Sequence, residues 1–116
     1  MDITIWHNPR CSKSRITLQM LRDRGVEPTV LEYLKTPPSA DDIRAVAARL
    51  GVEPKAMMRT KEAVFRELNL GAADDGALIG AMADHPILIE RPVVIAGDQA
   101  VLGRPPENID RLFLTP

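Results

Sequence analysis

Hydrophobic and polar positions follow strand-like runs near the N-terminus and helical spacing directly after it. Residues Ile3–Trp6 are rich in strand-forming side chains and end at the turn-forming tripeptide His-Asn-Pro. A second strand is predicted over residues 28–34, "PTVLEYL". Between them a helix is predicted from about Cys11 to its cap at Gly25, with apolar positions at Ile16, Leu18, Met20 and Leu21. This order is typical of two parallel strands joined by a right-handed crossover.

The middle of the chain is predicted to be helical. After the break "KTPPSADD", Ser39 and Asp42 form a capping-box-like start for a helix over Asp41 to Leu50. Two more helical stretches are predicted near residues 61–68 and 75–84, and Pro86 ends this part. We therefore expect a helical insertion over about residues 39–86.

The C-terminal part predicts a hairpin and a last helix. Strands at Pro92–Ala96 and Ala100–Leu102 are separated by the turn signal Gly97–Asp98, and "RPPENIDRLF" begins a final helix. The complete order is β-α-β, a helical insertion, then β-β-α. It predicts a single thioredoxin-like α/β domain over residues 1–116, with a four-stranded mixed sheet and helices on both faces. In such a fold, the end of the first strand and the start of the first helix form the reactive edge.

Composition narrows the possible partners and the compartment. The 116 residues carry a net charge of −1 and one cysteine. No global basic field attracts nucleic acid or a membrane, and an internal disulfide or a cysteine-based zinc site is excluded. The N-terminus is too polar for a secretory signal. We expect a cytoplasmic protein without a bound metal, and a monomer, because nothing in the sequence indicates an obligate oligomer.

The single cysteine lies among cations at a predicted helix start. Arg10 precedes Cys11, and Lys13 and Arg15 follow it. Unpaired backbone N–H groups and the helix dipole at this end favour a thiolate over a thiol, as do the neighbouring cations. His7 lies four residues earlier in the loop, from where it can donate a hydrogen bond to the sulfur.

The same stretch can also hold a small oxyanion. It offers successive N–H groups, the hydroxyls of Ser12 and Ser14, and the guanidinium of Arg15. An activated sulfur beside an anion site indicates sulfur attacking an oxyanion. The alternatives are a cysteine that is only a small buried hydrophobe, and a solvated turn in which Ser12 or Ser14 caps the helix.

Three further arginines lie at element boundaries rather than within helices. Arg59 follows two methionines, Arg91 precedes Pro92 at the start of a strand, and Arg104 precedes two prolines. Arginine matches a tetrahedral oxyanion better than lysine does because its planar fork offers several donors. Each residue alone would be read as a surface arginine, but the set favours an anion site.

The chain resembles the glutaredoxin-coupled arsenate reductases, closest to their short bacterial members with a Cys-Ser-Lys-Ser stretch. The likeness runs in order over nearly the whole chain. It is carried by the motifs "HNPRCSKSR" (7–15), "LEYL..PPS" (31–39), "MMR" (57–59), "LNL" (68–70), "HPILIERPVVI" (85–95) and "GRPPE" (103–107).

The resemblance implies a monothiol reduction of arsenate to arsenite. Cys11 matches the catalytic cysteine, which attacks arsenic(V), and His7 matches the histidine that lowers its pKa. Arg59, Arg91 and Arg104 match the arginines that hold the oxyanion. Glutathione then attacks the arsenylated sulfur as co-substrate, and glutaredoxin removes the glutathione. No metal or organic cofactor is bound in this scheme.

The resemblance also implies a cis peptide bond before Pro92, facing the cysteine; the alternative is an ordinary trans proline that opens an edge strand. Two other functions stay open at this point. One is a general thiol–disulfide enzyme that glutathionylates or deglutathionylates proteins and needs Cys11 but not all the arginines. The other is a non-enzymatic regulator of the same superfamily that binds RNA polymerase, although Ser14 replaces the second cysteine of the usual redox switch.

Overall fold

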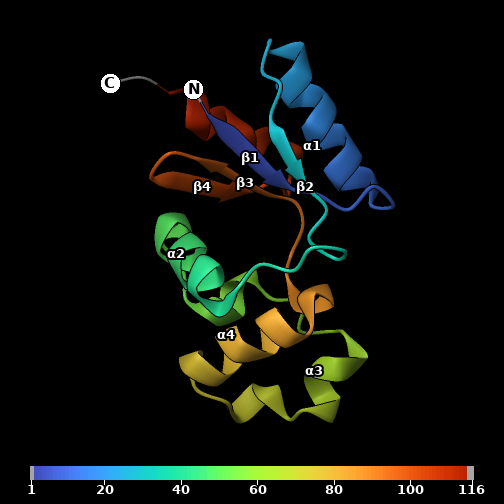
Figure 1. Cartoon of the computed structure of the whole chain (residues 1–116), viewed down its shortest axis with the longest axis vertical. Coiled ribbons are helices and arrows are strands. Elements are labelled where there is room, and N and C mark those ends of the chain that lie inside the picture. Colours follow the sequence, from blue (N-terminus) through green and yellow to red (C-terminus); the bar gives the residue numbers. More distant parts are fainter. Residues whose placement is uncertain (1, 115–116) are drawn as a thin grey trace. The chain divides into compact units, whose positions relative to one another are not determined.

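A four-stranded sheet unites the two ends of the chain in the computed structural model, which describes residues 2–114. Residues 2–36 and 91–114 form one compact unit around this sheet, and residues 37–90 form a second unit. The first unit contains β1 (Ile3–Trp6), α1 (Ser12–Asp23), β2 (Thr29–Leu31), β3 (Val93–Ala96), β4 (Gln99–Leu102) and the helix η4 (Pro106–Phe113). These elements are labelled or coloured in Figure 1.

The strand order in the sheet is β2-β1-β3-β4. β2 is parallel to β1, with Val30 opposite Ile5, whereas β3 is antiparallel to β1 and places Val94 opposite the same isoleucine. β4 pairs antiparallel with β3, with Val101 opposite Val94. The predicted α/β class, the thioredoxin-like order of elements and the four-stranded mixed sheet are therefore confirmed.

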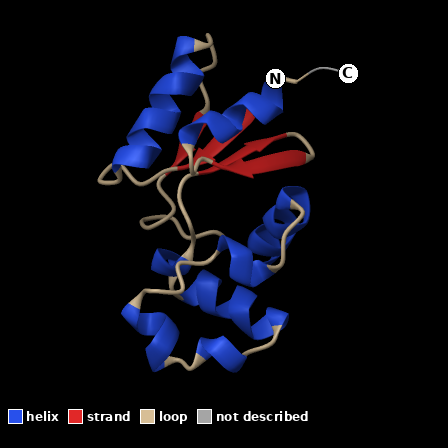
Figure 2. Ribbon diagram, turned by 180° about the vertical axis from the view of Figure 1, so that it is seen from behind, coloured by secondary structure: helices blue, strands red, loops and turns tan. Residues whose placement is uncertain are grey.

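One face of the sheet forms the core of the first unit. Alternate strand residues point to this face because side chains in a strand alternate between its two sides. α1 and η4 cover it, as Figure 2 shows. The buried cluster consists of Ile3, Ile5, Leu21, Val94, Ala96, Val101, Ile109 and Leu112. Burying each large aliphatic side chain contributes about 1.5–3 kcal/mol. Helices on the other face of the sheet stay a prediction.

The buried side of α1 differs from its apolar sequence pattern. Ile16 is 50% exposed, whereas the buried positions are Ser14, Thr17 and Leu21, spaced as one helical face. Thr17 tolerates burial because its Oγ1 donates to the carbonyl of Lys13 at 2.7 Å. Two polar side chains thus occupy positions where hydrophobic spacing alone predicts apolar ones.

Two further predictions need correction in length or type. β2 ends at Leu31 rather than continuing to residue 34, because the carbonyl of Glu32 accepts from Lys35 N and Thr36 N and turns the chain. The final helix η4 is a 3₁₀ helix rather than an α-helix. Asn108 N donates to the carbonyl of Pro105, three residues back, at 3.0 Å. The carbonyl of Arg104, which would accept the N–H of Asn108 in an α-helix, instead accepts from the Asn108 side chain.

The second unit consists of short helices joined by loops, with one β-bridge between Met58 and Ile89. The predicted capping box at its first helix is confirmed, with Ser39 Oγ accepting from Asp42 N at 3.1 Å and Gly51 in the left-handed conformation at the other end. The helix predicted near residues 61–68 is present but shorter, at Ala63–Glu67. The unit contains α2 (Ala40–Leu50), η1 (Pro54–Met57), α3 (Ala63–Glu67), η2 (Leu70–Ala72), α4 (Asp75–Asp84) and η3 (Pro86–Leu88).

The single domain expected over residues 1–116 stays a prediction, and residues 1, 115 and 116 lie outside the described residues. Among residues 2–114, no helix has the length and apolar character needed to cross a membrane.

Candidate active site

Cys11 is the N-cap residue of α1. Its backbone is extended, and its carbonyl accepts the first helical hydrogen bond, from Arg15 N at 3.0 Å. Its own N–H donates to the carbonyl of Asn8 at 3.0 Å, which anchors the preceding loop. The side chain is partly buried, and no side chain caps this end of the helix. The first N–H groups of α1 are therefore available to the sulfur.

The surroundings of Cys11 favour its thiolate. Burial by itself raises the pKa of the thiol. Hydrogen bonding from the backbone N–H of Ser14, from the Arg91 side chain and from the N–H of Lys13, together with the charge of Arg91, outweighs burial. The pKa of Cys11 is therefore lowered from its usual value. Because the thiolate is the nucleophilic form, this arrangement activates the sulfur.

His7 contacts Ser14 through its Nδ1, and its expected hydrogen bond to the sulfur stays a prediction. The two side chains are buried, and His7 Nδ1 lies 2.6 Å from Ser14 Oγ. The same Oγ accepts from Asn8 N at 3.1 Å. Burial lowers the pKa of His7, against the opposing charge of Glu32. The imidazole is therefore neutral at neutral pH. His7 positions Ser14 through the contact between their side chains, and the backbone N–H of Ser14 donates to the sulfur.

The Ser14 side chain is occupied by this contact. Its Oγ bonds His7 and Asn8 and is fully buried, so the hydroxyl belongs to the support of the loop. The arrangement leaves the backbone N–H of Ser14 as its contact with Cys11. An oxyanion-binding role of Ser14 stays a prediction, and its N–H is the group suited to that role.

Arg91 is the cation that the structure places beside the sulfur. Only Pro92, which is buried, separates Arg91 from the first residue of β3, and the Arg91–Pro92 peptide bond is cis. The Nε and Nη1 atoms of Arg91 are buried and have no hydrogen-bond partner among the described residues. Buried donors are almost always paired, so two unpaired guanidinium nitrogens beside a thiolate indicate a place for an anion.

Arg104 and Arg15 take different positions in the same unit. Arg104 Nη1 lies 3.4 Å from the carbonyl of Arg91, which brings the two arginines together. Arg15 is exposed, and its Nη1 donates to the carbonyl of Pro9 at 3.0 Å. Arg15 therefore supports the loop before Cys11, and its oxyanion-binding role stays a prediction.

Arg59 belongs to the helical unit, where two carboxylates hold it. A backbone bridge orders this segment, with Arg59 N donating to Leu88 O at 2.7 Å and Glu90 N to Met57 O at 2.8 Å. Arg59 Nη1 lies 2.6 Å from Glu62 Oε1, and its Nε lies 3.8 Å from Glu90 Oε1. The positive charge of Arg59 is therefore offset within its own unit.

Gly103 opens the motif "GRPPE", but the sequence assigned it no role of its own. A Cβ at this position would lie 2.7 Å from Pro92 Cγ and 2.7 Å from Thr17 Oγ1. Gly103 N also donates to the carbonyl of Pro92 at 2.9 Å. Glycine thus lets the end of β4 approach both α1 and the Arg91–Pro92 segment. Its only signal in the sequence is a glycine between a strand and Arg104.

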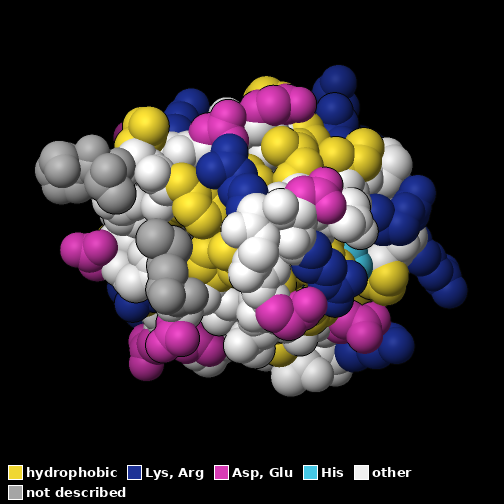
Figure 3. Space-filling model, turned by 90° about the horizontal axis from the view of Figure 1, so that it is seen from above, with side chains coloured by type: hydrophobic (Ala, Val, Ile, Leu, Met, Phe, Trp, Pro, Cys, Tyr) yellow, Lys and Arg dark blue, Asp and Glu magenta, His cyan; other side chains and the backbone are white. Residues whose placement is uncertain are grey.

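Charges of both signs are interleaved on the face of the molecule in Figure 3. Lys and Arg side chains lie beside Asp and Glu, in agreement with the net charge of −1. The electrostatic effect on Cys11 is therefore local and comes from Arg91 and the start of α1.

Known proteins are similar to this chain over nearly its whole length. The pattern of the ArsC family matches residues 6–112. An "Arsenate reductase" of Neisseria meningitidis serogroup A is 46% identical over 115 residues, covering 97% of this chain and 98% of that protein. "Uncharacterized protein YfgD" of Escherichia coli is 48% identical over 111 residues, covering 93% of each.

A solved structure agrees with these matches. "Arsenate reductase from Vibrio cholerae" superposes with a TM-score of 0.93 at 49% identity, covering 96% of this chain and 97% of that one. The site and the fold define a thiol-bearing α/β protein in which a partly buried arginine lies beside the thiol. This chain belongs to the ArsC family.

Proposed function

We propose that this protein reduces arsenate to arsenite with Cys11 as the nucleophile. The observation that carries the proposal is an activated thiol beside Arg91, whose Nε and Nη1 are buried and have no partner within residues 2–114. An oxyanion in that position would accept hydrogen bonds from these two nitrogens and lie within reach of the sulfur. The arsenate reductases of N. meningitidis and V. cholerae, at 46% and 49% identity, support arsenate as the anion.

The first step forms a bond between sulfur and arsenic. The Cys11 thiolate attacks arsenic(V), and an arsenate oxygen leaves as hydroxide or water. Arg91 and Arg104 stabilise the negative charge on the remaining oxygens. On the family resemblance, Arg59 is a further ligand of the oxyanion. His7 and Ser14 hold the N–H groups at the start of α1 in place.

The second step transfers the electrons. The thiolate of glutathione attacks the arsenylated sulfur of Cys11, the sulfur–arsenic bond breaks, and its electron pair stays on arsenic, which leaves as arsenite. The products are arsenic(III) and a Cys11–glutathione mixed disulfide. A thiol of glutaredoxin then attacks the glutathione sulfur and releases Cys11. A chain with one cysteine needs such external thiols because it cannot form its own resolving disulfide.

Several further features belong to the same proposal. No metal or organic cofactor takes part, because the two electrons come from the thiols of glutathione and glutaredoxin. The reaction belongs in the cytoplasm, where glutathione keeps thiols reduced. We expect the monomer to be the active form.

Turnover of the purified protein tests the proposal. With glutathione, glutaredoxin and arsenate, the protein should form arsenite, and Cys11→Ser should reduce the rate to that of the mixture without enzyme. Equal rates with the two proteins would contradict the proposal. Mixed-disulfide exchange without any arsenite formation would instead favour the thiol–disulfide enzyme.

A further inference from the structure

A pocket of about 260 Å³ opens beside the loop that leads to Cys11. The loop of residues 7–10 forms one wall, and Glu32, Leu34 and Lys35, after the end of β2, form the other. All of these residues belong to the first unit. Small-molecule sites usually enclose about 300–1,000 Å³, so this pocket suits a small, partly exposed ligand.

Backbone hydrogen bonds order both walls of the pocket. His7 N donates to the carbonyl of Leu31 at 2.8 Å, which ties the loop to the end of β2. Arg10 N donates to Asn8 Oδ1 at 3.0 Å, which shapes the turn that carries the Arg10 side chain. On the other wall, Lys35 N donates to the carbonyl of Glu32 at 2.9 Å. The pocket is therefore built on two fixed turns.

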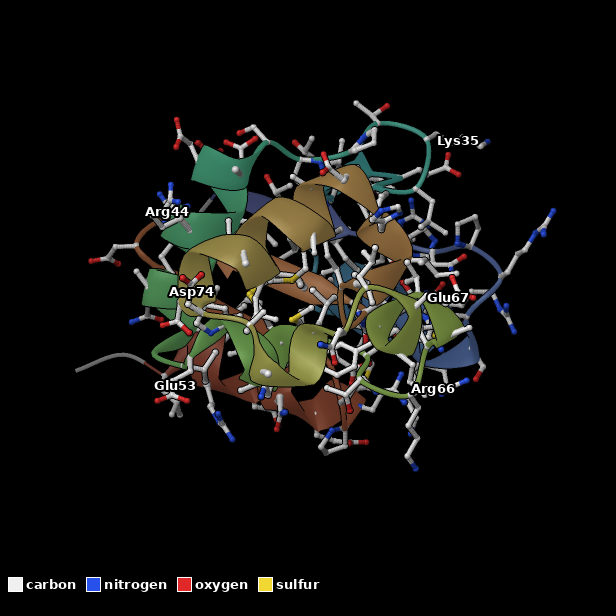
Figure 4. The ribbon with its side chains drawn as sticks, turned by 90° about the horizontal axis from the view of Figure 1, so that it is seen from below. Lys35, Arg44, Glu53, Arg66, Glu67 and Asp74 are labelled. Carbon is white, nitrogen blue, oxygen red and sulfur yellow. The ribbon has the colours of Figure 1, made fainter. Side chains whose placement is uncertain are left out.

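The charges of the pocket form a pattern of two cations and one anion. Arg10 and Lys35 are exposed, and Lys35 Nζ lies 3.4 Å from Glu32 Oε1. In Figure 4, Lys35 projects outward from its loop. A ligand with two carboxylates and one ammonium group complements this pattern, because each of its charges meets an opposite one. Leu34 adds an apolar wall for the ligand's uncharged part.

The pocket adjoins the nucleophile through the backbone. Asn8 lines the pocket, and its carbonyl accepts the N–H of Cys11 at 3.0 Å. A ligand in the pocket therefore lies next to the residue whose sulfur reacts. For exchange to occur, a thiol or disulfide group at the centre of that ligand must reach this sulfur while its charged ends stay in the pocket.

We propose that this pocket binds a small zwitterionic thiol of the glutathione type, through Arg10 and Lys35 for its carboxylates and Glu32 for its ammonium group. The pocket selects the thiol that reacts at Cys11, and the inference rests on the proposed function only in requiring a reactive Cys11. An uncharged thiol cannot form these ion pairs with Arg10, Lys35 and Glu32.

Disulfide exchange without arsenate tests this inference. The Cys11 thiolate attacks one sulfur of oxidised glutathione, a Cys11–glutathione disulfide forms, and one glutathione thiolate leaves; mass spectrometry follows the adduct. The uncharged bis(2-hydroxyethyl) disulfide undergoes the same exchange. In the double variant Arg10→Ala/Lys35→Ala, exchange with oxidised glutathione should slow by about three- to tenfold, the effect of two exposed ion pairs. Exchange with the uncharged disulfide should stay unchanged, because the pKa of Cys11 is lowered by Arg91 and by the N–H groups at the start of α1.

A matched control removes a cation elsewhere. Arg111→Ala deletes an exposed arginine of η4 and should leave both exchange rates unchanged. Glu32→Gln should slow only the reaction of oxidised glutathione. Equal slowing with both disulfides would overturn the proposal, because the residues would then act on Cys11 itself. Unchanged rates with both would also overturn it.

The outcomes separate this inference from the proposed function. If the wild-type protein prefers oxidised glutathione through Arg10 and Lys35 but does not reduce arsenate, the pocket is supported and the proposed function fails. If arsenate reduction occurs but the double variant retains the wild-type preference, the pocket fails and the proposed function stands.

Discussion

Arg91 and Arg59 show how differently the two units hold an arginine. Arg91, beside Cys11, has two buried nitrogens without a partner among the described residues. Arg59, in the helical unit, is bound by Glu62 at 2.6 Å and lies 3.8 Å from Glu90. The Arg91 guanidinium therefore has donors left for an anion. The Arg59 guanidinium would have to release a carboxylate before it could bind one. An arginine at a site is therefore defined by its existing partners as much as by its position.

The largest effect is expected for Arg91→Ala. This variant should lower arsenate turnover by about 10²–10³-fold, the usual result of removing a donor that stabilises developing negative charge. Steady-state kinetics with glutathione and glutaredoxin measure the effect. The conservative Arg91→Lys should lose less because it keeps the charge, and a variant with wild-type turnover would remove Arg91 from the mechanism.

The same variant should change the titration of Cys11. Arg91 lowers the pKa of the thiol, so its loss should move the pH midpoint of alkylation by iodoacetamide upward. The stabilisation that the thiolate gives the folded protein is complete above the pKa of an unfolded thiol, about 8.5, and is lost as the pH falls through the lower folded pKa. Arg91→Ala should therefore reduce the stability difference between Cys11 and Cys11→Ser proteins at high pH.

The next effect concerns the packing that holds Arg91 in place. Gly103→Ala puts a methyl group 2.7 Å from both Pro92 Cγ and Thr17 Oγ1. The overlap should destabilise the protein by about 1–3 kcal/mol, measured by urea unfolding. As a control, Gly80→Ala in α4 meets no atom within 4 Å, and should stabilise its helix by about 0.5–1 kcal/mol. Equal stability of the two variants would show that the Gly103 contact relaxes easily.

A smaller effect on the thiol is expected for Ser14→Ala. The variant leaves His7 Nδ1 and Asn8 N without their partner and should cost about 1–3 kcal/mol of stability. The backbone N–H of residue 14 remains, so the pKa of Cys11 should rise less than in Arg91→Ala. Alkylation rates at several pH values compare the two variants. A larger rise with Ser14→Ala would mean that the side chain controls the start of α1.

The smallest effect, and one of opposite sign, is expected for Glu62→Gln. Removing the carboxylate frees Arg59, so arsenate should bind about two- to fivefold more tightly, since a partly exposed ion pair contributes about 0.2–1 kcal/mol. Titration calorimetry with arsenate and no thiol reductant measures the affinity. Glu67→Gln, at an exposed residue of the same helix labelled in Figure 4, is the matched control.

A double variant separates the two explanations of that result. If Arg59 binds the oxyanion, Arg59→Ala should weaken binding, and Glu62→Gln should add nothing in its presence. Unchanged binding in Arg59→Ala would place Arg59 outside the anion site. Weakened binding in Arg59→Ala with no gain in Glu62→Gln would mean that Glu62 does not compete with the anion.

The elements set by local signals were predictable from the sequence. β1, the start of α1 at Cys11, the capping box at Ser39 and the helix over 75–84 each depend on neighbours within about one helical turn. The position of the thiol at a helix N-terminus follows from the same local information. Cys11 could therefore be recognised as activated before its long-range contacts were known.

Hydrogen bonds that no hydrophobic pattern reveals decided other features. β2 ends early because the carbonyl of Glu32 closes a turn, and η4 is a 3₁₀ helix because the Asn108 side chain takes a carbonyl that an α-helix would use. Neither the turn at Glu32 nor the Asn108 hydrogen bond produces a hydrophobic pattern in the sequence. The pattern of apolar residues also misplaced Ile16, because polar Ser14 and Thr17 are buried through hydrogen bonds instead.

By itself, the sequence determined the order of elements, the mixed sheet and the placement of one thiol among cations, because propensities, caps and hydrophobic spacing act over a few residues. Only the tertiary structure decided which cation reaches the sulfur, that His7 supports Ser14, and that Gly103 must lack a side chain. These outcomes depend on contacts between residues far apart in the chain. Such contacts follow from packing and desolvation in the folded protein, where a buried guanidinium either finds a carboxylate or keeps its donors for a ligand.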